Sequence, residues 1–74
     1  MSLTLKALRI NAGLDQKTAA KRLGIVPETL SSWERAKSFP NAKQITEIEK
    51  LYGVSYSDIN FLPSEIGLNE GKEG

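Results

Sequence analysis

One short stretch of the sequence carries polar side chains at the spacing of a helix face. If successive residues turn by about 100° and Leu30 points inward, four polar side chains fall on or beside the opposite side: they are Glu28, Ser31, Ser32 and Arg35. Carboxylate, hydroxyl and guanidinium groups can hydrogen-bond to base edges and phosphates. Most polar helix faces are simply solvated, so this face alone leaves both interpretations open.

The residues around this face predict two short helices joined by a tight turn. The carboxylate of Asp15 can cap the first helix, and Gly24 can end it in a left-handed conformation. Pro27 suits the first position of the second helix, where its missing N–H is not needed. The apolar positions have helical spacing: they are Ala19, Ala20 and Leu23, then Leu30 and Trp33. Such a pair of helices is a helix-turn-helix, whose second helix reads the major groove of DNA.

Two longer segments also carry helix signals, and the fold class they predict is all-α. The first helix should begin near Leu3 or Leu5, capped by Ser2 or Thr4, and Gly13 should end it. Its expected inward residues are Leu5, Leu8 and Ala12. A later helix should follow the capping-box spacing of Asn41 and Gln44 and continue to Tyr52. Its expected inward residues are Ile45, Ile48 and Leu51.

The end of the chain predicts one more short helix and then a polar tail. Ser55 and Asp58 repeat the cap spacing, so a last helix is expected through Ile59 and Phe61. We therefore expect a helix-turn-helix domain over residues 1–62 and a flexible, polar, glycine-rich tail over residues 63–74.

Length and composition exclude several classes of function. Seventy-four residues make one small domain, and the absence of cysteine and histidine removes the usual metal ligands and the usual general base. Asp15, Glu28 and Glu34 have plainer roles than carboxylate catalysis, so no enzyme, metal or cofactor is expected. No apolar run approaches the ~20 residues that span a bilayer, which favours a cytoplasmic, nucleoid-associated protein.

The charges are divided unevenly along the chain. Residues 1–43 hold eight Lys and Arg against three Asp and Glu, a net charge of +5. Residues 44–74 hold two against six, a net charge of −4. Because the basic half contains the two central helices, the domain should present them to a polyanion.

Six segments of the sequence, in order, resemble the Cro/repressor family of helix-turn-helix DNA-binding domains, often called the XRE family. The resemblance extends from Leu5 to about Phe61. Its segments are Leu5-Lys6-x-Leu8-Arg9, Gly13-Leu14-x-Gln16, Ala20-x-x-Leu23-Gly24-Ile25, Thr29-Leu30-Ser31-x-Trp33-Glu34-Arg35, Pro40 and Leu51-Tyr52-Gly53-Val54-Ser55. It implies a five-helix, lambda-repressor-like domain that binds operator DNA, usually as a dimer.

The resemblance also implies roles for individual residues. Gln16 matches a position that holds a phosphate and can reach a base. The base-reading positions are matched by Glu28, Thr29 and Ser32, beside Ser31. Arg9 and Glu34 match a structural ion pair between the first and third helices. From their charge and position we expect Lys17, Arg35 and Lys37 to contact phosphates.

Three residues depart from the family's pattern. Val26 stands where a capping Ser or Thr is usual, so the second helix of the motif should lack a side-chain cap. Pro27 replaces a residue whose side chain could contact a base. Ala36 stands where Gly is common, so that helix is expected to end in a different turn or to run on slightly.

The sequence thus predicts a regulator of transcription that binds double-stranded DNA in a sequence-specific way, similar to small phage or prophage repressors. One alternative is a DNA-binding antitoxin or an interaction module of a toxin–antitoxin pair. A third is a structural domain that has lost DNA affinity. No membrane or small-molecule partner is indicated. A homodimer on DNA is expected through the apolar residues of the second half: Ile59, Phe61, Leu62, Ile66 and Leu68.

Overall fold

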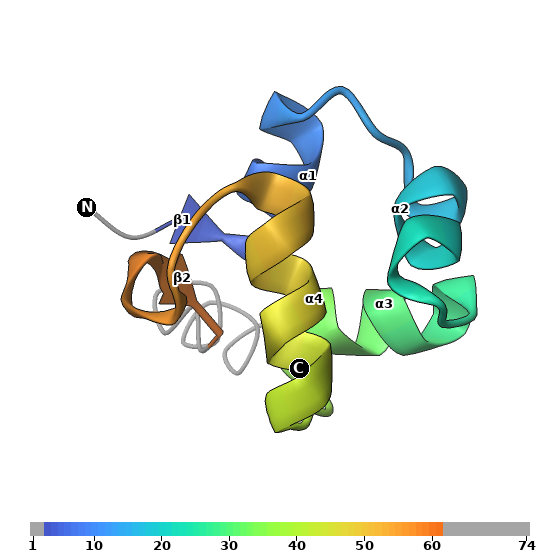
Figure 1. Cartoon of the computed structure of the whole chain (residues 1–74). Helices are drawn as coiled ribbons and strands as arrows, with labels where there is room; N and C mark the ends of the chain where they lie inside the picture. The colour runs from blue at the N-terminus through green and yellow to red at the C-terminus, as the bar shows by residue number, and fades with distance from the viewer. Residues whose placement is uncertain (1–2, 62–74) are drawn as a thin grey trace, which may run out of the picture.

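The computed structural model of the chain describes residues 3–61 (Figure 1). Its elements, in order, are β1 (Leu3–Thr4), α1 (Leu5–Asn11), α2 (Gln16–Leu23), α3 (Pro27–Glu34), α4 (Ala42–Tyr52), the 3-10 helix η1 (Tyr56–Asp58) and β2 (Ile59–Asn60). The two short strands pair in parallel, with Leu3 opposite Ile59. In Figure 1 this pair lies on one side of α4, while α2 and α3 lie on the other.

Local capping defines the beginnings of three helices. The Thr4 hydroxyl accepts a hydrogen bond from the Ala7 N–H at 3.1 Å at the start of α1. The Asp15 carboxylate accepts from the Thr18 N–H at 2.7 Å at the start of α2. Asn41 and Gln44 form the predicted capping box, with both of its hydrogen bonds at 2.8 Å. Each cap provides an acceptor for a backbone donor that the helix itself leaves free.

The core joins all four α-helices and the second strand. Its buried side chains are Leu5, Leu8, Ala19, Ala20, Leu30, Trp33, Ile48 and Ile59. Ala19 and Ala20 are fully buried, and their small size lets α2 pack closely against both α3 and α4. Trp33 is buried as expected, so it packs the domain and does not present a stacking surface to bases.

The prediction of a short helix through Ile59 and Phe61 was wrong. After one 3-10 turn, Ile59 and Asn60 extend and pair with Leu3 and Thr4. The Ser55 side chain accepts no backbone N–H at the start of this turn; its hydroxyl donates to the Asp58 carboxylate at 3.0 Å. The described residues therefore contain four α-helices and one 3-10 helix, not five α-helices.

Two predictions about apolar residues also need correction. Ile59 was expected on a dimer surface, but only 7% of it is exposed because the extended backbone turns it into the core. Ala12 was expected inward, but α1 ends at Asn11, and Ala12 is exposed at the cap just before Gly13, which has a φ of +76°. Ser2, Leu62, Ile66, Leu68 and the predicted tail over 63–74 lie outside the described residues.

Candidate nucleic-acid interface

The outward side of α3 is polar and open to solvent. Leu30 and Trp33 hold the inner side of this helix in the core. Glu28 and Arg35 are exposed on the outer side, and Thr29, Ser31 and Ser32 are half-buried beside them. Four of the predicted contact residues thus lie on α3, and Arg35 lies at its C-cap.

The N-terminal end of α3 carries two exposed apolar residues. Val26 is the N-cap residue, with φ −88° and ψ 154°, and its side chain makes no capping hydrogen bond. It is 57% exposed. Pro27 follows at the first helical position and is exposed as well. The helix therefore begins without the side-chain cap that α1, α2 and α4 possess.

The C-terminal end of α3 turns sharply at Ala36. The backbone of Ala36 is left-handed, with a φ of +59°. The Lys37 N–H then donates to the Ser32 carbonyl at 2.8 Å, and the Ala36 N–H donates to the Trp33 carbonyl at 3.1 Å. This is the turn that glycine usually makes after a helix, so the expectation of a different turn or a longer helix was wrong. Lys37 is exposed immediately after the turn.

A buried ion pair fixes the end of α3 to α1. Arg9 Nε lies 2.7 Å from Glu34 Oε2, and Arg9 Nη2 donates to Glu34 Oε1 at 3.2 Å. The two side chains are only 10% and 4% exposed. Arg9 Nη1 also donates to the Leu14 carbonyl at 3.0 Å, which ties in the loop before α2. The hydrogen bond to Glu34 raises the pKa of Arg9, so the guanidinium stays charged.

Gln16 extends this network to α2. Its Nε2 donates to Glu34 Oε1 at 3.1 Å, so the carboxylate at the end of α3 receives donors from both α1 and α2. Sequence reasoning assigned Gln16 to a phosphate and missed this contact, because nothing in the spacing connects residues 18 positions apart. One amide hydrogen and the amide oxygen remain for a further partner, since Glu34 uses a single donor.

Tyr52 lies near the same ion pair. Burial, and secondly the charge of Glu34, raise the pKa of its phenol to about 12 against the opposing effect of Arg9. The hydroxyl is buried and has no hydrogen-bond partner in the described part of the chain. The side chain packs against the core at the end of α4.

Several lysine and arginine side chains lie on α2 and at the end of α3. Among the described residues, Arg9 is the one basic residue that forms an ion pair. Lys17 is exposed in the first turn of α2, beside Gln16. Lys21 and Arg22 are exposed in its last turn. Arg35 is exposed at the C-cap of α3, where its Nε donates to the Ser31 carbonyl at 3.4 Å. These positions place positive charge on the elements that flank the polar face.

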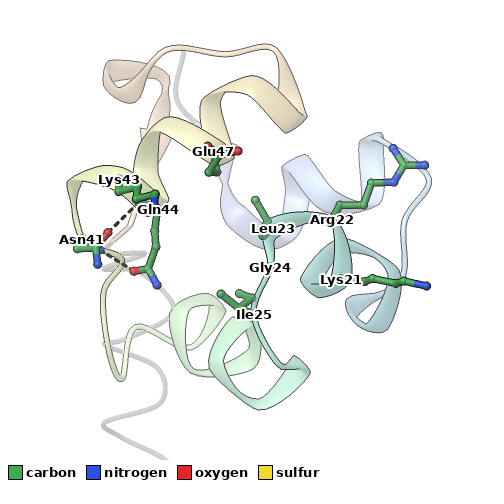
Figure 2. Close-up of a pocket in the computed structure, with 9 residues that line it drawn as sticks. All are labelled: Lys21, Arg22, Leu23, Gly24, Ile25, Asn41, Lys43, Gln44 and Glu47. Atoms are coloured by element: carbon green, nitrogen blue, oxygen red, sulfur yellow. Dashed lines mark hydrogen bonds between the residues drawn. The ribbon is translucent and has the colours of Figure 1, made fainter.

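A shallow groove of about 490 Å³ separates the end of α2 from the start of α4 (Figure 2). Its lining residues are Lys21, Arg22, Leu23, Gly24, Ile25, Asn41, Lys43, Gln44 and Glu47. In Figure 2, Lys21 and Arg22 extend away from α4, while Asn41 and Gln44 bond to each other. Because its polar groups do not converge, the groove lacks the arrangement of a small-molecule site.

Within residues 3–61 no cluster of His, Cys, Asp and Glu could hold a metal ion. The helices in the same range are all too short and too polar to cross a bilayer. What the fold does provide is a helix-turn-helix whose second helix is fixed at its inner side and open at its outer side. This arrangement defines a helix-turn-helix DNA-binding domain.

Comparison with known families agrees with this classification. Residues 5–59 match the family model described as helix-turn-helix, of the Cro/repressor or XRE type. The chain therefore belongs to this helix-turn-helix family, whose domains bind DNA and are not enzymes. The comparisons with curated proteins and with solved structures found no match.

Proposed function

We propose that this protein regulates transcription by occupying an operator in double-stranded DNA. The observation that carries the proposal is the exposed polar face of α3 on a helix held at its last residue by a buried ion pair. A rigid helix with an accessible polar face suits the major groove, where side chains must meet base edges at hydrogen-bonding distance. Repression follows when the bound protein excludes polymerase from the site.

Base recognition is assigned to the polar residues of α3. Glu28 is exposed and can accept a hydrogen bond from a cytosine amino group. Thr29 and Ser32 are half-buried, with Ser31 beside them, so we expect them to contact only those bases that lie close to the helix surface. Ser32→Gln should change the preferred base at one position of each half-site. A binding profile unchanged by substitutions at both Glu28 and Ser32 would contradict this assignment.

Phosphate binding is assigned to Lys17, Arg35 and Lys37, with the one amide hydrogen of Gln16 that Glu34 does not use. Lys17 lies in the first turn of α2 and Lys37 in the loop after α3, so we expect them to reach the DNA backbone from different sides of α3. Lys17→Ala should weaken binding to all duplexes alike and reduce the slope of log K against log salt by roughly 1. Lys50→Ala, in the last turn of α4, is the matched control and should leave the slope unchanged.

The experiment that tests the function is selection of bound duplexes from a random library, followed by titration of the selected site at several salt concentrations. A folded sample that shows no duplex affinity at low salt would refute the proposal. A common sequence among the selected duplexes would support it.

We further propose that two copies bind one operator. A single reading helix covers a few base pairs, which gives little selectivity against a genome. Two reading helices related by a two-fold axis lie ~34 Å apart on successive turns. The described residues available for such a contact include Tyr56, which is exposed, and Phe61, whose ring centroid lies 5.7 Å from that of Tyr56. Sedimentation with full and half operators measures the stoichiometry, and one chain per full operator would contradict this proposal.

A further inference from the structure

Val26 neither caps α3 nor lies buried in the core. It is the N-cap residue of α3, where a hydrogen-bonding side chain would cap the helix, and its side chain makes no such bond. It also exposes 57% of its aliphatic surface, although the core lies on the other side of α3. A valine at this position therefore costs helix stability and gains nothing from burial.

The neighbouring residues extend this apolar surface. Pro27 is exposed directly after Val26 and has no side-chain donor or acceptor. The first polar side chain of α3 is that of Glu28. The N-terminal residues of a reading helix are those that enter the major groove of DNA most deeply. The leading end of α3 is therefore apolar at the place where base edges would lie.

The major groove presents one apolar group, the C5-methyl of thymine, which 5-methylcytosine also carries. We propose that Val26, supported by Pro27, is a specificity-determining residue that contacts the C5-methyl group of a pyrimidine in the operator. The inference rests on the proposed DNA-binding function and names the group that the uncapped end of α3 recognises. It also explains why a residue that cannot cap the helix occupies this position.

The test uses the operator selected by the wild-type protein and replaces thymine by uracil, one position at a time. This replacement removes only the methyl group. At one thymine per half-site we expect binding about fourfold weaker, the factor that corresponds to taking one methyl-sized group out of an apolar contact. Replacing that thymine by 5-methylcytosine, with guanine opposite it, tests whether the methyl is read independently of the rest of the base.

Val26→Ser separates the two roles of this position. Serine can cap α3, so the melting temperature should rise by roughly 4–8 °C. The thymine-to-uracil ratio at the sensitive position should fall from about four to about one, as it should in Val26→Ala, because both variants lack the two γ-methyl groups of valine. Ile10→Ala is the matched control, since Ile10 is 56% exposed on α1 and its removal should leave the ratio unchanged.

Three results would overturn the inference. The ratio could persist in both Val26 variants, or no thymine in the selected operator could be sensitive to loss of its methyl. The ratio could also disappear in Thr29→Ser, which removes one methyl from α3, while it persists in the Val26 variants. A folded protein that selects no DNA sequence refutes the proposed function itself, whereas specific binding without methyl sensitivity refutes only the role of Val26.

Discussion

Arg9→Ala should be among the most damaging single substitutions in this domain. It removes the bidentate contacts to Glu34 and the contact to the Leu14 carbonyl. It leaves a carboxylate that is 4% exposed with Gln16 as its remaining side-chain donor in the described region. Breaking a buried pair in this way costs about 3–5 kcal/mol, because the surviving charge is shielded from water and keeps only the neutral amide of Gln16 as a side-chain donor in the described region.

That loss is large relative to the whole stability of a small domain. At about 0.05–0.15 kcal/mol per residue, a chain of this length has roughly 4–11 kcal/mol of unfolding free energy. A loss of 3 kcal/mol should lower the melting temperature by about 12–24 °C. Urea denaturation followed by circular dichroism measures the free energy of unfolding, and Lys6→Ala, an exposed position on the same helix, should change it by less than ~0.5 kcal/mol.

The double variant Arg9→Met/Glu34→Leu keeps the experiment informative if the single variant does not fold. With both charges gone no carboxylate is stranded, so the double variant should be more stable than Arg9→Ala. A double-mutant cycle that compares the wild type, Arg9→Met, Glu34→Leu and the double variant then gives the coupling energy of the pair. Equal losses for Arg9→Ala and Lys6→Ala would refute the reasoning, as would strictly additive losses in the cycle.

Three other predictions concern backbone strain, a buried hydroxyl and a titrating cap. Ala36→Gly should stabilise the domain by about 0.5–1 kcal/mol in urea denaturation, because glycine adopts the left-handed φ of +59° without steric cost; a loss of stability would contradict this. Tyr52→Phe should leave the free energy of unfolding unchanged or raise it by up to ~1 kcal/mol, because the hydroxyl is buried without a partner in the described residues. A loss above ~1 kcal/mol would contradict this and reveal a hydrogen bond. Tyr56→Phe, at an exposed position, is the control. The Thr18 N–H lowers the pKa of Asp15, so its contribution is present above the unfolded pKa and is lost as pH falls through the folded pKa. Melting curves of the wild type and Asp15→Asn should therefore differ by a constant amount near neutral pH, with the difference shifting in favour of the asparagine variant below about pH 4; a difference independent of pH would exclude this cap as a titrating group.

The features that the sequence predicted well are those that depend on neighbours along the chain. The caps at Asp15 and Asn41 join residues three positions apart, and the periodicity of Leu30 and Trp33 identifies the buried side of α3. The last segment was predicted wrongly because its extended form depends on pairing with Leu3 and Thr4, which are more than fifty residues away. A local sequence pattern cannot identify a pairing strand at that separation.

In the candidate interface, too, the local features were predicted from the sequence and the contacts between distant residues were not. Helical spacing was enough to place Glu28, Ser32 and Arg35 on one side of a helix. It could not show that Gln16 donates to Glu34, because that contact exists only once α2 and α3 have packed. The turn at Ala36 was also misjudged, since the surrounding hydrogen bonds hold alanine in a conformation that its own preference disfavours.

The position of Glu34 links the stability of the domain to the geometry of DNA reading. It is the last residue of α3 and accepts hydrogen bonds from α1 and α2, while Leu30 and Trp33 hold the same helix against the core. The opposite end, at Val26, has no side-chain attachment. The reading helix is therefore fixed at its C-terminal end and along its inner side, and its N-terminal end projects freely. Such an arrangement keeps the direction of α3 constant while Val26, Pro27 and Glu28 at its N-terminal end stay exposed.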